Sequence, residues 1–350
     1  MTTRGSFWIG GAPIAITTGT ALRGQMYVAW EKPDEPAHDT PIVLVHGGGG
    51  QGTDYLTTPD DRPGWAQLLV AQGYTVYVVD RPGHGRSPLH PDVIGPVAPM
   101  MGAETLGAIF VPRPGDHPTA ELHTQWPGGR EPGDPVFDQF YASQGPTLAD
   151  LAEAHTLDQA ALSALLERIG PAVLVSHSAG GPGVYLAADA NPGLVRAVVA
   201  VEALGPQFLK NPEAGLELAW GLANARFSYD PPAASPEELQ LVTDASGPIP
   251  LVLQAEPARR LPGLAQAPIA LVSGEASGFR WFDDHVRRFL EQAGCHVDLL
   301  RLHEHGVYGN GHGLIFEKNN AEALSVVTAW LDKVLATPAN ITTGTAASRS

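Results

Sequence analysis

Ser178 lies in a short segment whose residue types and spacing suit a catalytic nucleophile. Residues 172–176 have the composition of a buried strand and residues 180–190 that of a helix, so the serine falls in the turn between them. Such a turn needs small neighbours and pushes the hydroxyl out at the end of the sheet, which is the geometry of the G-x-S-x-G nucleophile elbow. Here Ser176 replaces the first glycine and Gly180 supplies the second. The alternative is an ordinary glycine-rich turn.

A nucleophilic serine needs a base within hydrogen-bond reach, and three histidines follow the last predicted strand at 297–302. His312 stands between two glycines in a loop that could carry its imidazole over the serine, whereas His303 and His305 stand at the strand end. We therefore predict His312 as the base, in the chain order serine, acid, histidine. No metal site is predicted, because His303 and His305 have no evident third ligand and no H-E-x-x-H occurs.

The acid that would orient this histidine has two candidates. Glu275 follows the predicted strand at 268–273, the more familiar place for a triad acid. Glu202 ends the apolar run 197–201, where a carboxylate needs a partner because burying an unpaired charge is costly. For each, a structural salt bridge is the alternative, and the residues alone leave the choice open.

The glycine-rich stretch 46–52 follows another predicted buried strand and has two chemical interpretations. Its glycines satisfy G-x-G-x-x-G, the dinucleotide fingerprint of a dehydrogenase, but residues 53–64 are rich in turns where that fingerprint requires a helix. The second interpretation is an oxyanion loop of the H-G-G-G type, whose bare N–H groups approach a developing alkoxide. We predict the N–H groups of Gly48 and Ala179 as the oxyanion donors, with a loop of no chemical role as the alternative.

Composition narrows the choice of partners. The formal net charge of −16 at pH 7 disfavours nucleic acid and anionic membrane surfaces, because no basic patch is available. No apolar run of about 18 residues predicts a membrane span. The first residues lack the apolar segment of a signal peptide, although a signal could have been removed. Location therefore stays open between cytoplasmic and exported.

Alternating strands and helices predict an α/β fold with a mostly parallel, doubly wound sheet, opened by an antiparallel pair at 7–16 and 24–31. In such sheets sites gather at the carboxyl ends of strands. We expect residues 1–202 and 265–336 to form the core. The remaining divisions are an irregular proline-rich insertion at 88–148, a helical cap at 203–264 with helices at 213–225 and 236–242, and a disordered tail at 337–350.

Aromatic side chains of the insertion and the cap are candidates for an apolar substrate pocket, with packing as the alternative for each: Phe140, Tyr141, Trp220, Phe227 and Tyr229. The glycine turn at 80–87, which follows the predicted strand 74–79, is expected only to shape its loop.

Four motifs together resemble the α/β-hydrolase superfamily over about residues 40 to 335: His46-Gly-Gly-Gly-Gly, Asp80-Arg-Pro-Gly-His-Gly-Arg-Ser87, Ser176-His-Ser-Ala-Gly180 and Gly309-Asn-Gly-His312. More narrowly, the chain is similar to bacterial serine esterases whose triad acid is a glutamate after the strand that follows the elbow. Glu202 occupies that place, so the resemblance favours Glu202 over Glu275.

The resemblance implies an α/β-hydrolase fold and a serine hydrolase that cleaves carboxylic esters through an acyl-enzyme. Ser178 would attack, His312 would take its proton and Glu202 would orient His312. A small-molecule ester is the implied partner, no cofactor or metal is required, a homodimer stays open, and the source would be bacterial. The same residues would also serve a lactonase, amidase, thioesterase or carbon–carbon hydrolase, and a non-catalytic binding protein that reuses the pocket is a further alternative.

Overall fold

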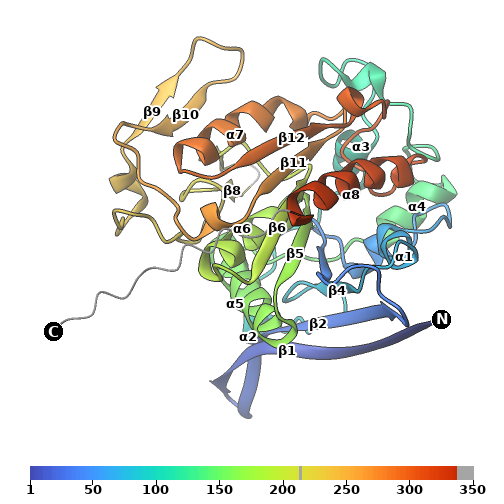
Figure 1. Cartoon of the computed structure of the whole chain (residues 1–350), viewed down its shortest axis with the longest axis horizontal. Helices are drawn as coiled ribbons and strands as arrows, with labels where there is room; N and C mark the ends of the chain where they lie inside the picture. Colours follow the sequence, from blue (N-terminus) through green and yellow to red (C-terminus); the bar gives the residue numbers. More distant parts are fainter. Residues whose placement is uncertain (213–214, 337–350) are drawn as a thin grey trace.

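The computed structural model describes residues 1–212 and 215–336, and an eight-stranded sheet runs through its centre (Figure 1). The strand order is β1-β2-β4-β3-β5-β6-β11-β12. The two outer strands on one side are antiparallel, and every pair from β4 to β12 is parallel. The strands are β1 (Thr2–Ile16), β2 (Gly19–Pro33), β3 (Ile42–Val45), β4 (Val76–Asp80), β5 (Ala172–His177), β6 (Val195–Val201), β11 (Ile269–Ser273) and β12 (Val297–Arg301). The predicted fold class, a mostly parallel doubly wound sheet, is confirmed.

Helices cover both faces of this sheet, which is why its central strands are continuous apolar runs. All residues of β3 and β5 are buried. One hydrophobic cluster lies under α5 (Leu151–Ile169), α6 (Gly181–Ala190) and α7 (Asp283–Gln292), and a second lies under α1 (Trp65–Ala71) and α8 (Asn320–Ala336). The parallel strands all point their carboxyl ends to one edge, where the candidate residues of the sequence are found.

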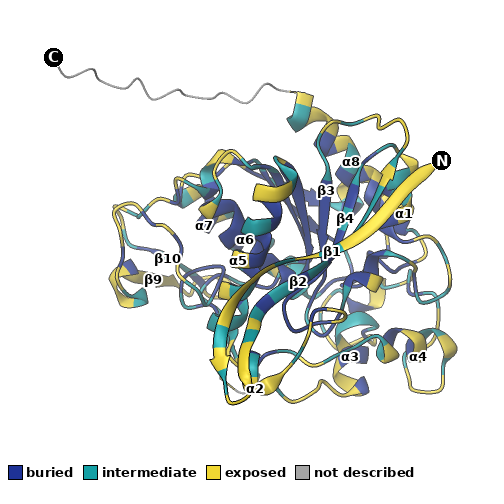
Figure 2. Cartoon of the chain, turned by 90° about the horizontal axis from the view of Figure 1, so that it is seen from below, coloured by how far each residue is buried: buried dark blue, intermediate teal, exposed yellow. Residues whose placement is uncertain are grey.

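The opening hairpin is longer than predicted. β1 and β2 pair from Thr2 with Pro33 to Ile16 with Gly19, well beyond the expected ranges 7–16 and 24–31. Most of the additional residues are polar or small, and backbone pairing does not require an apolar side chain. Figure 2 shows β1 exposed along most of its length, because it forms the outer edge of the sheet.

The insertion at 88–148 is more regular than the sequence indicated. It contains the short helices α2 (Pro91–Ile94), α3 (Ala103–Phe110) and α4 (Pro135–Ala142) and the 3-10 turn η2 (Ala120–Leu122). Asp134 caps α4 by accepting from the N–H groups of two residues in its first turn. The helices were missed because each is short and lies between prolines, so none shows a helical period.

The predicted helices of the cap are wrong. The described residues of 203–264 form the short strands β7 (Lys210–Asn211), β8 (Leu216–Glu217), β9 (Leu241–Asp244) and β10 (Leu251–Gln254), with the 3-10 turn η4 (Pro236–Leu239) and the start of another, η5 (Leu264–Gln266). Residues 213–214 lie outside the described part. Trp220, Phe227 and Tyr229 are buried in the hydrophobic cluster under α5, α6 and α7. Tertiary packing has therefore overridden helix propensity here.

Two predictions about the ends and boundaries stay predictions. The expected disordered tail at 337–350 lies outside the described residues. The division into a core of residues 1–202 and 265–336 and a cap of residues 203–264 is not decided by the arrangement of elements. Within 1–212 and 215–336, none of the helices combines the length and the apolar character that crossing a bilayer requires.

Candidate active site

The turn that carries Ser178 is as tight as its sequence predicted. β5 ends at His177, the 3-10 turn η3 spans Ser178–Gly180, and α6 follows at once. Ser178 has φ of 50°, a left-handed conformation that is uncommon for a residue other than glycine. A Cβ on Gly180 would lie 2.5 Å from the carbonyl oxygen of His46, so only glycine fits there. Backbone strain of this kind concentrates at functional sites.

The structure brings Ser178, His312 and Glu202 together in one hydrogen-bonded chain. His312 Nε2 lies 3.0 Å from Ser178 Oγ, and His312 Nδ1 lies 3.3 Å from Glu202 Oε2. Glu202 directly follows β6, and His312 comes from the loop after β12 and the 3-10 turn η7 (Leu302–His305). This is the geometry of a nucleophile, a base and an acid that orients the base.

The Glu202 carboxylate is buried and receives further hydrogen bonds. Gly274 N–H donates to Oε1 over 2.7 Å, and the Ser277 hydroxyl donates to Oε2. Burial raises the pKa of Glu202 to about 8, and these two hydrogen bonds act against that shift by favouring the ionised form. Burial lowers the pKa of His312 to about 3, so the imidazole is held neutral and can accept a proton.

Glu275, the other candidate acid, has a different position. Its Oε1 accepts from the backbone N–H of Gly309 over 2.7 Å, and its backbone carbonyl accepts from Arg280. The structure therefore pairs Glu202, and not Glu275, with the imidazole of His312. His303 and His305 lie in η7 at the end of β12, where His305 is exposed.

Arg81 joins the two segments that carry the predicted oxyanion donors. Its guanidinium donates through Nη2 to the carbonyl oxygens of Gly47 at 3.1 Å and Gly48 at 3.2 Å, and through Nη1 to that of Ala179 at 3.3 Å. It is buried and paired with Asp158 of α5 at 2.8 Å. The carbonyl of Gly47 and the N–H of Gly48 share one trans peptide and point in opposite directions, so a donor on the carbonyl fixes the direction of the N–H.

Arg81 was not among the predicted site residues, because the turn at 80–87 was expected only to shape its loop. The available signal was an arginine directly after a buried strand, where the charge must be paired. The glycine loop at 46–52 does not have the structure of a dinucleotide site. The 3-10 turn η1 (Gly52–Tyr55) follows it where that site requires a helix, and α1 begins only at Trp65.

His177, the residue before the serine, was also missed. It is buried, and its Nε2 lies 2.8 Å from the carbonyl oxygen of His312, so it must donate there. Burial lowers the pKa of His177 to about 3, which keeps the ring neutral with its proton on Nε2. The imidazole of His312 is further covered by Phe279, whose ring stacks on it at 4.0 Å. His177 of the elbow therefore supports the loop that carries His312.

A cavity of about 260 Å³ opens onto these residues. Ser178, His312, Gly48 and Ala179 all line it. Much of the remaining wall is apolar and comes from the insertion, from α5 and from single residues beyond them: Met101, Leu106, Ile109, Phe110, Phe140, Leu148, Leu151, Leu204, Leu216, Phe279 and Phe316. The site can therefore hold a molecule with an apolar group beside the serine hydroxyl.

Of the five aromatic residues predicted to line a pocket, the structure places one in this wall, Phe140. Tyr141 stacks on Phe137 within the insertion, at 6.3 Å between ring centroids. Trp220, Phe227 and Tyr229 belong to the core on the α5–α6–α7 face. The prediction is wrong for these four, because an aromatic residue type specifies an apolar environment without specifying which one.

The chain belongs to the α/β-hydrolase family, whose family model, described as "Alpha/beta hydrolase family", matches residues 42–325. It is 39% identical over 315 residues to "Probable secreted lipase phiG" of Fungal sp. (strain ATCC 74256), a match that covers 88% of this chain and 86% of that protein. This relative is fungal, so the expected bacterial source receives no support.

A solved structure, "The Atomic Resolution Structure of a Novel Bacterial Esterase", has a TM-score of 0.69 and 23% sequence identity, and the match covers 95% of each chain. At that identity the similarity shows the fold alone.

Proposed function

We propose that this protein hydrolyses carboxylic esters through an acyl-enzyme formed on Ser178. The observation that carries the proposal is the hydrogen-bonded chain from Ser178 Oγ through His312 to Glu202, opening onto an apolar cavity. The 39% identity to a protein named as a lipase supports the same reaction class. The name of that relative also supports export from the cell.

In the first half of the reaction, Ser178 Oγ attacks the ester carbonyl carbon while its proton passes to His312 Nε2. Glu202 accepts from Nδ1–H and stabilises the imidazolium that forms. The negative oxygen of the tetrahedral intermediate accepts from the N–H groups of Gly48 and Ala179. The carbon–oxygen bond then breaks, and His312 returns the proton to the leaving alcohol.

In the second half, a water molecule gives its proton to His312 as it attacks the acyl-enzyme. The new intermediate collapses, Ser178 recovers its proton, and the carboxylic acid leaves. Arg81 would hold the Gly48 N–H toward the oxyanion throughout, since it binds the carbonyl of the same peptide. The apolar wall would receive the acyl or alcohol group of the ester.

The decisive test is intact-mass spectrometry after treatment with an alkyl fluorophosphonate, alongside turnover of a short p-nitrophenyl ester. We expect one adduct on the wild type and none on Ser178→Ala, with turnover reduced by about three or more orders of magnitude. Ser176→Ala is the matched control, because the buried Ser176 hydroxyl lies two residues away and has no hydrogen-bond partner in the described part of the chain. It should keep both the adduct and the turnover.

The outcomes separate the alternatives. An adduct without ester turnover would favour another reaction of the same triad, tested with thioesters, lactones and amides. Neither an adduct nor turnover in the wild type would overturn ester hydrolysis and favour a binding protein.

A further inference from the structure

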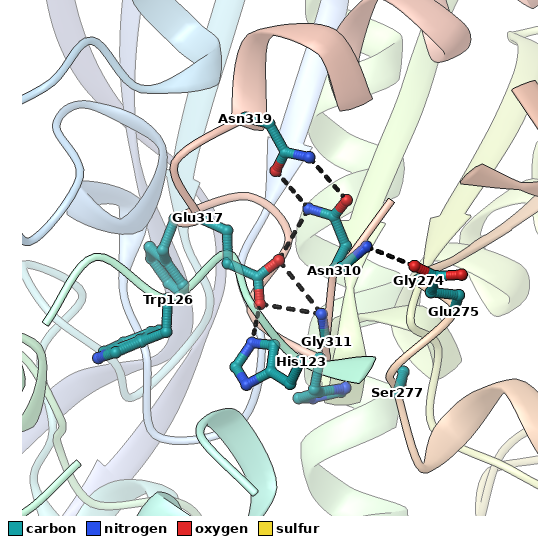
Figure 3. Close-up of polar contacts among 12 residues, drawn as sticks. His123, Trp126, Gly274, Glu275, Ser277, Asn310, Gly311, Glu317 and Asn319 are labelled. Carbon is teal, nitrogen blue, oxygen red and sulfur yellow. Dashed lines mark hydrogen bonds and ion pairs between the residues drawn. The ribbon is translucent and has the colours of Figure 1, made fainter. Parts of the chain in front are cut away.

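A second buried carboxylate, Glu317, lies beside Asn310 and Gly311, the two residues that precede His312 (Figure 3). Its Oε1 lies 2.7 Å from His123 Nε2 and 3.0 Å from the N–H of Gly311. Its Oε2 lies 2.8 Å from Asn310 Nδ2 and 3.2 Å from the same N–H of Gly311. A carboxylate removed from water is stable only when donors surround it, and here every one of these partners donates.

These contacts fix the residue directly before the base. The N–H of Gly311 is held by Glu317, and the imidazole of His312 is the next side chain along. Asn310 is held a second time by Asn319, since each side-chain amide donates to the other over 2.6 and 3.0 Å. A displacement of the Gly311 peptide would move the imidazole of His312 relative to Ser178 Oγ, and so change the reacting geometry.

Glu317 also connects this loop with the insertion at 88–148. His123 comes from the insertion, between η2 and α4. The residues after it continue the contact: Thr124 N–H donates to the carbonyl of Gly309 over 3.0 Å, and Lys318 N–H donates to that of Gln125 over 2.8 Å. The same insertion supplies Phe110 and Phe140 to the cavity wall, so the wall and the base are held by one cluster.

The two glycines of Gly309-Asn-Gly-His312 are explained by this contact. A Cβ on Gly309 would collide with the hydroxyl of Thr124, and a Cβ on Gly311 would lie 3.0 Å from Nε2 of His123. The insertion therefore approaches the backbone of the loop as closely as it can. These two glycines therefore form a surface on which the insertion packs closely.

We propose that Glu317 is a positioning residue for the base: it fixes the Asn310 and Gly311 segment directly before His312 and, through His123, ties that segment to the insertion that lines the substrate cavity. This inference rests on the proposed function, in which His312 is the base. The charge of Glu317 adds to the effect, because it raises the pKa of His312 against the lowering by burial and so favours the imidazolium formed in the reaction.

Glu317→Gln tests the carboxylate directly. The amide would turn an NH₂ group toward donors, so the shape is kept while at least one hydrogen bond is lost. The matched control is Glu322→Gln, which removes an exposed carboxylate in the first turn of α8. Two variants of His123 test its hydrogen bond. His123→Gln keeps a donor near the position of Nε2 and removes the ring, whereas His123→Phe keeps a ring and removes the donor. Comparing them separates the effect of the hydrogen bond from the effect of the ring.

We expect Glu317→Gln to lower kcat for a short p-nitrophenyl ester by about 10- to 100-fold with KM changed less than about threefold, because the loss lies in the orientation of the base. His123→Phe should lower kcat by about tenfold, and His123→Gln should restore it to within about threefold of the wild type. Thermal unfolding, followed in parallel, identifies any variant that fails to fold. Glu322→Gln should behave as the wild type.

Hydrogen exchange gives a measurement that does not depend on turnover. Peptides covering residues 309–313 and 123–126 should exchange their amide hydrogens faster in Glu317→Gln than in the wild type. In Glu322→Gln their exchange rates should equal those of the wild type. Slow exchange in Glu317→Gln, or wild-type kcat despite fast exchange, would overturn the inference. A wild type that neither turns over the ester nor reacts with the fluorophosphonate would instead overturn the proposed ester hydrolysis. The hydrogen exchange of Glu317→Gln would then still decide whether Glu317 holds the loop.

Discussion

Ser178 and Glu202 each stand one residue beyond the ends of neighbouring parallel strands, in register, because His177 of β5 pairs with Val201 of β6. Both residues have φ of 50°. Each strand thus ends in a strained residue whose side chain turns toward the same imidazole. The sheet itself therefore sets the separation between the proposed nucleophile and the proposed acid, and the loop of His312 has only to be held between them.

The first prediction separates the two candidate acids. Glu202→Gln keeps the shape of the side chain and removes the charge that would stabilise the imidazolium, so kcat should fall by about 1,000-fold or more. Glu275→Gln weakens one hydrogen bond to Gly309 N–H and should lower kcat by less than about tenfold. Steady-state kinetics on one ester, with both variants checked for folding, measures this. A larger loss in Glu275→Gln would show that the acid is wrongly assigned.

The second prediction concerns Arg81. Arg81→Lys keeps a positive charge but cannot reach the three carbonyls of Gly47, Gly48 and Ala179 together, so the Gly48 N–H should lose its fixed direction. We expect kcat to fall by about 100-fold with little change in KM. The affinity of a boronic acid, which forms a tetrahedral adduct, should fall in parallel.

Arg86→Lys is the control for this variant. Arg86 lies in the same turn, its side chain is half-exposed, and it pairs with Asp80 at 2.7 Å. Both variants should keep the charge and the fold. If Arg81→Lys and Arg86→Lys lost boronic acid affinity equally, the loss would reflect a general effect on the turn. The inference that Arg81 fixes the direction of the Gly48 N–H would then be wrong.

The third prediction is a maximum of stability near pH 6.5. Burial lowers the pKa of His84, His155, His177 and His312 to about 3, so the unfolded chain binds protons below pH 6.5 that the folded chain does not, and stability falls as the pH drops toward 3. Burial raises the pKa of Asp54 and Glu202 to about 8 and of Asp283 to about 7, so the stability that these three groups contribute at low pH is lost as the pH rises from about 4 through those values.

Urea unfolding between pH 4 and 9 measures this dependence as the free energy of unfolding. Below pH 6.5 the four histidines outnumber the three carboxyl groups, and above pH 6.5 the carboxyl groups act alone, which places the maximum of stability near pH 6.5. A free energy of unfolding that is flat from pH 4 to 6.5 would contradict the buried, neutral state of these histidines.

The fourth prediction tests the cavity wall beside the oxyanion loop. Met101 lines the cavity, and its Cε lies 3.9 Å from where a Cβ on Gly48 would stand. Met101→Trp should narrow this end and lower kcat/KM for a p-nitrophenyl hexanoate about tenfold more than for the acetate. Met100→Trp is the control, because Met100 is exposed and does not line this cavity. Equal effects on both esters would place the acyl group elsewhere.

The sequence by itself predicted the parts of the site that depend on neighbours along the chain. Ser178 was recognisable because a strand, a tight turn and a helix must follow one another with small residues between them, and all of that lies within about twenty residues. The glycine loop after β3 and the parallel sheet were predictable for the same reason, since buried apolar strands and glycine turns are local patterns.

What only the tertiary structure decided concerns residues that are far apart in the chain. Glu202 and Glu275 both follow parallel strands, and the sequence offered no reason from geometry why one should reach His312 and the other Gly309. Trp220 could not be assigned to the core or to the cavity from its type. The links from Arg81 to Gly47 and from His123 to Glu317 join segments whose proximity follows from packing alone. Local patterns specify which conformation a segment adopts, whereas the identity of its partners is set only when the whole core is closed.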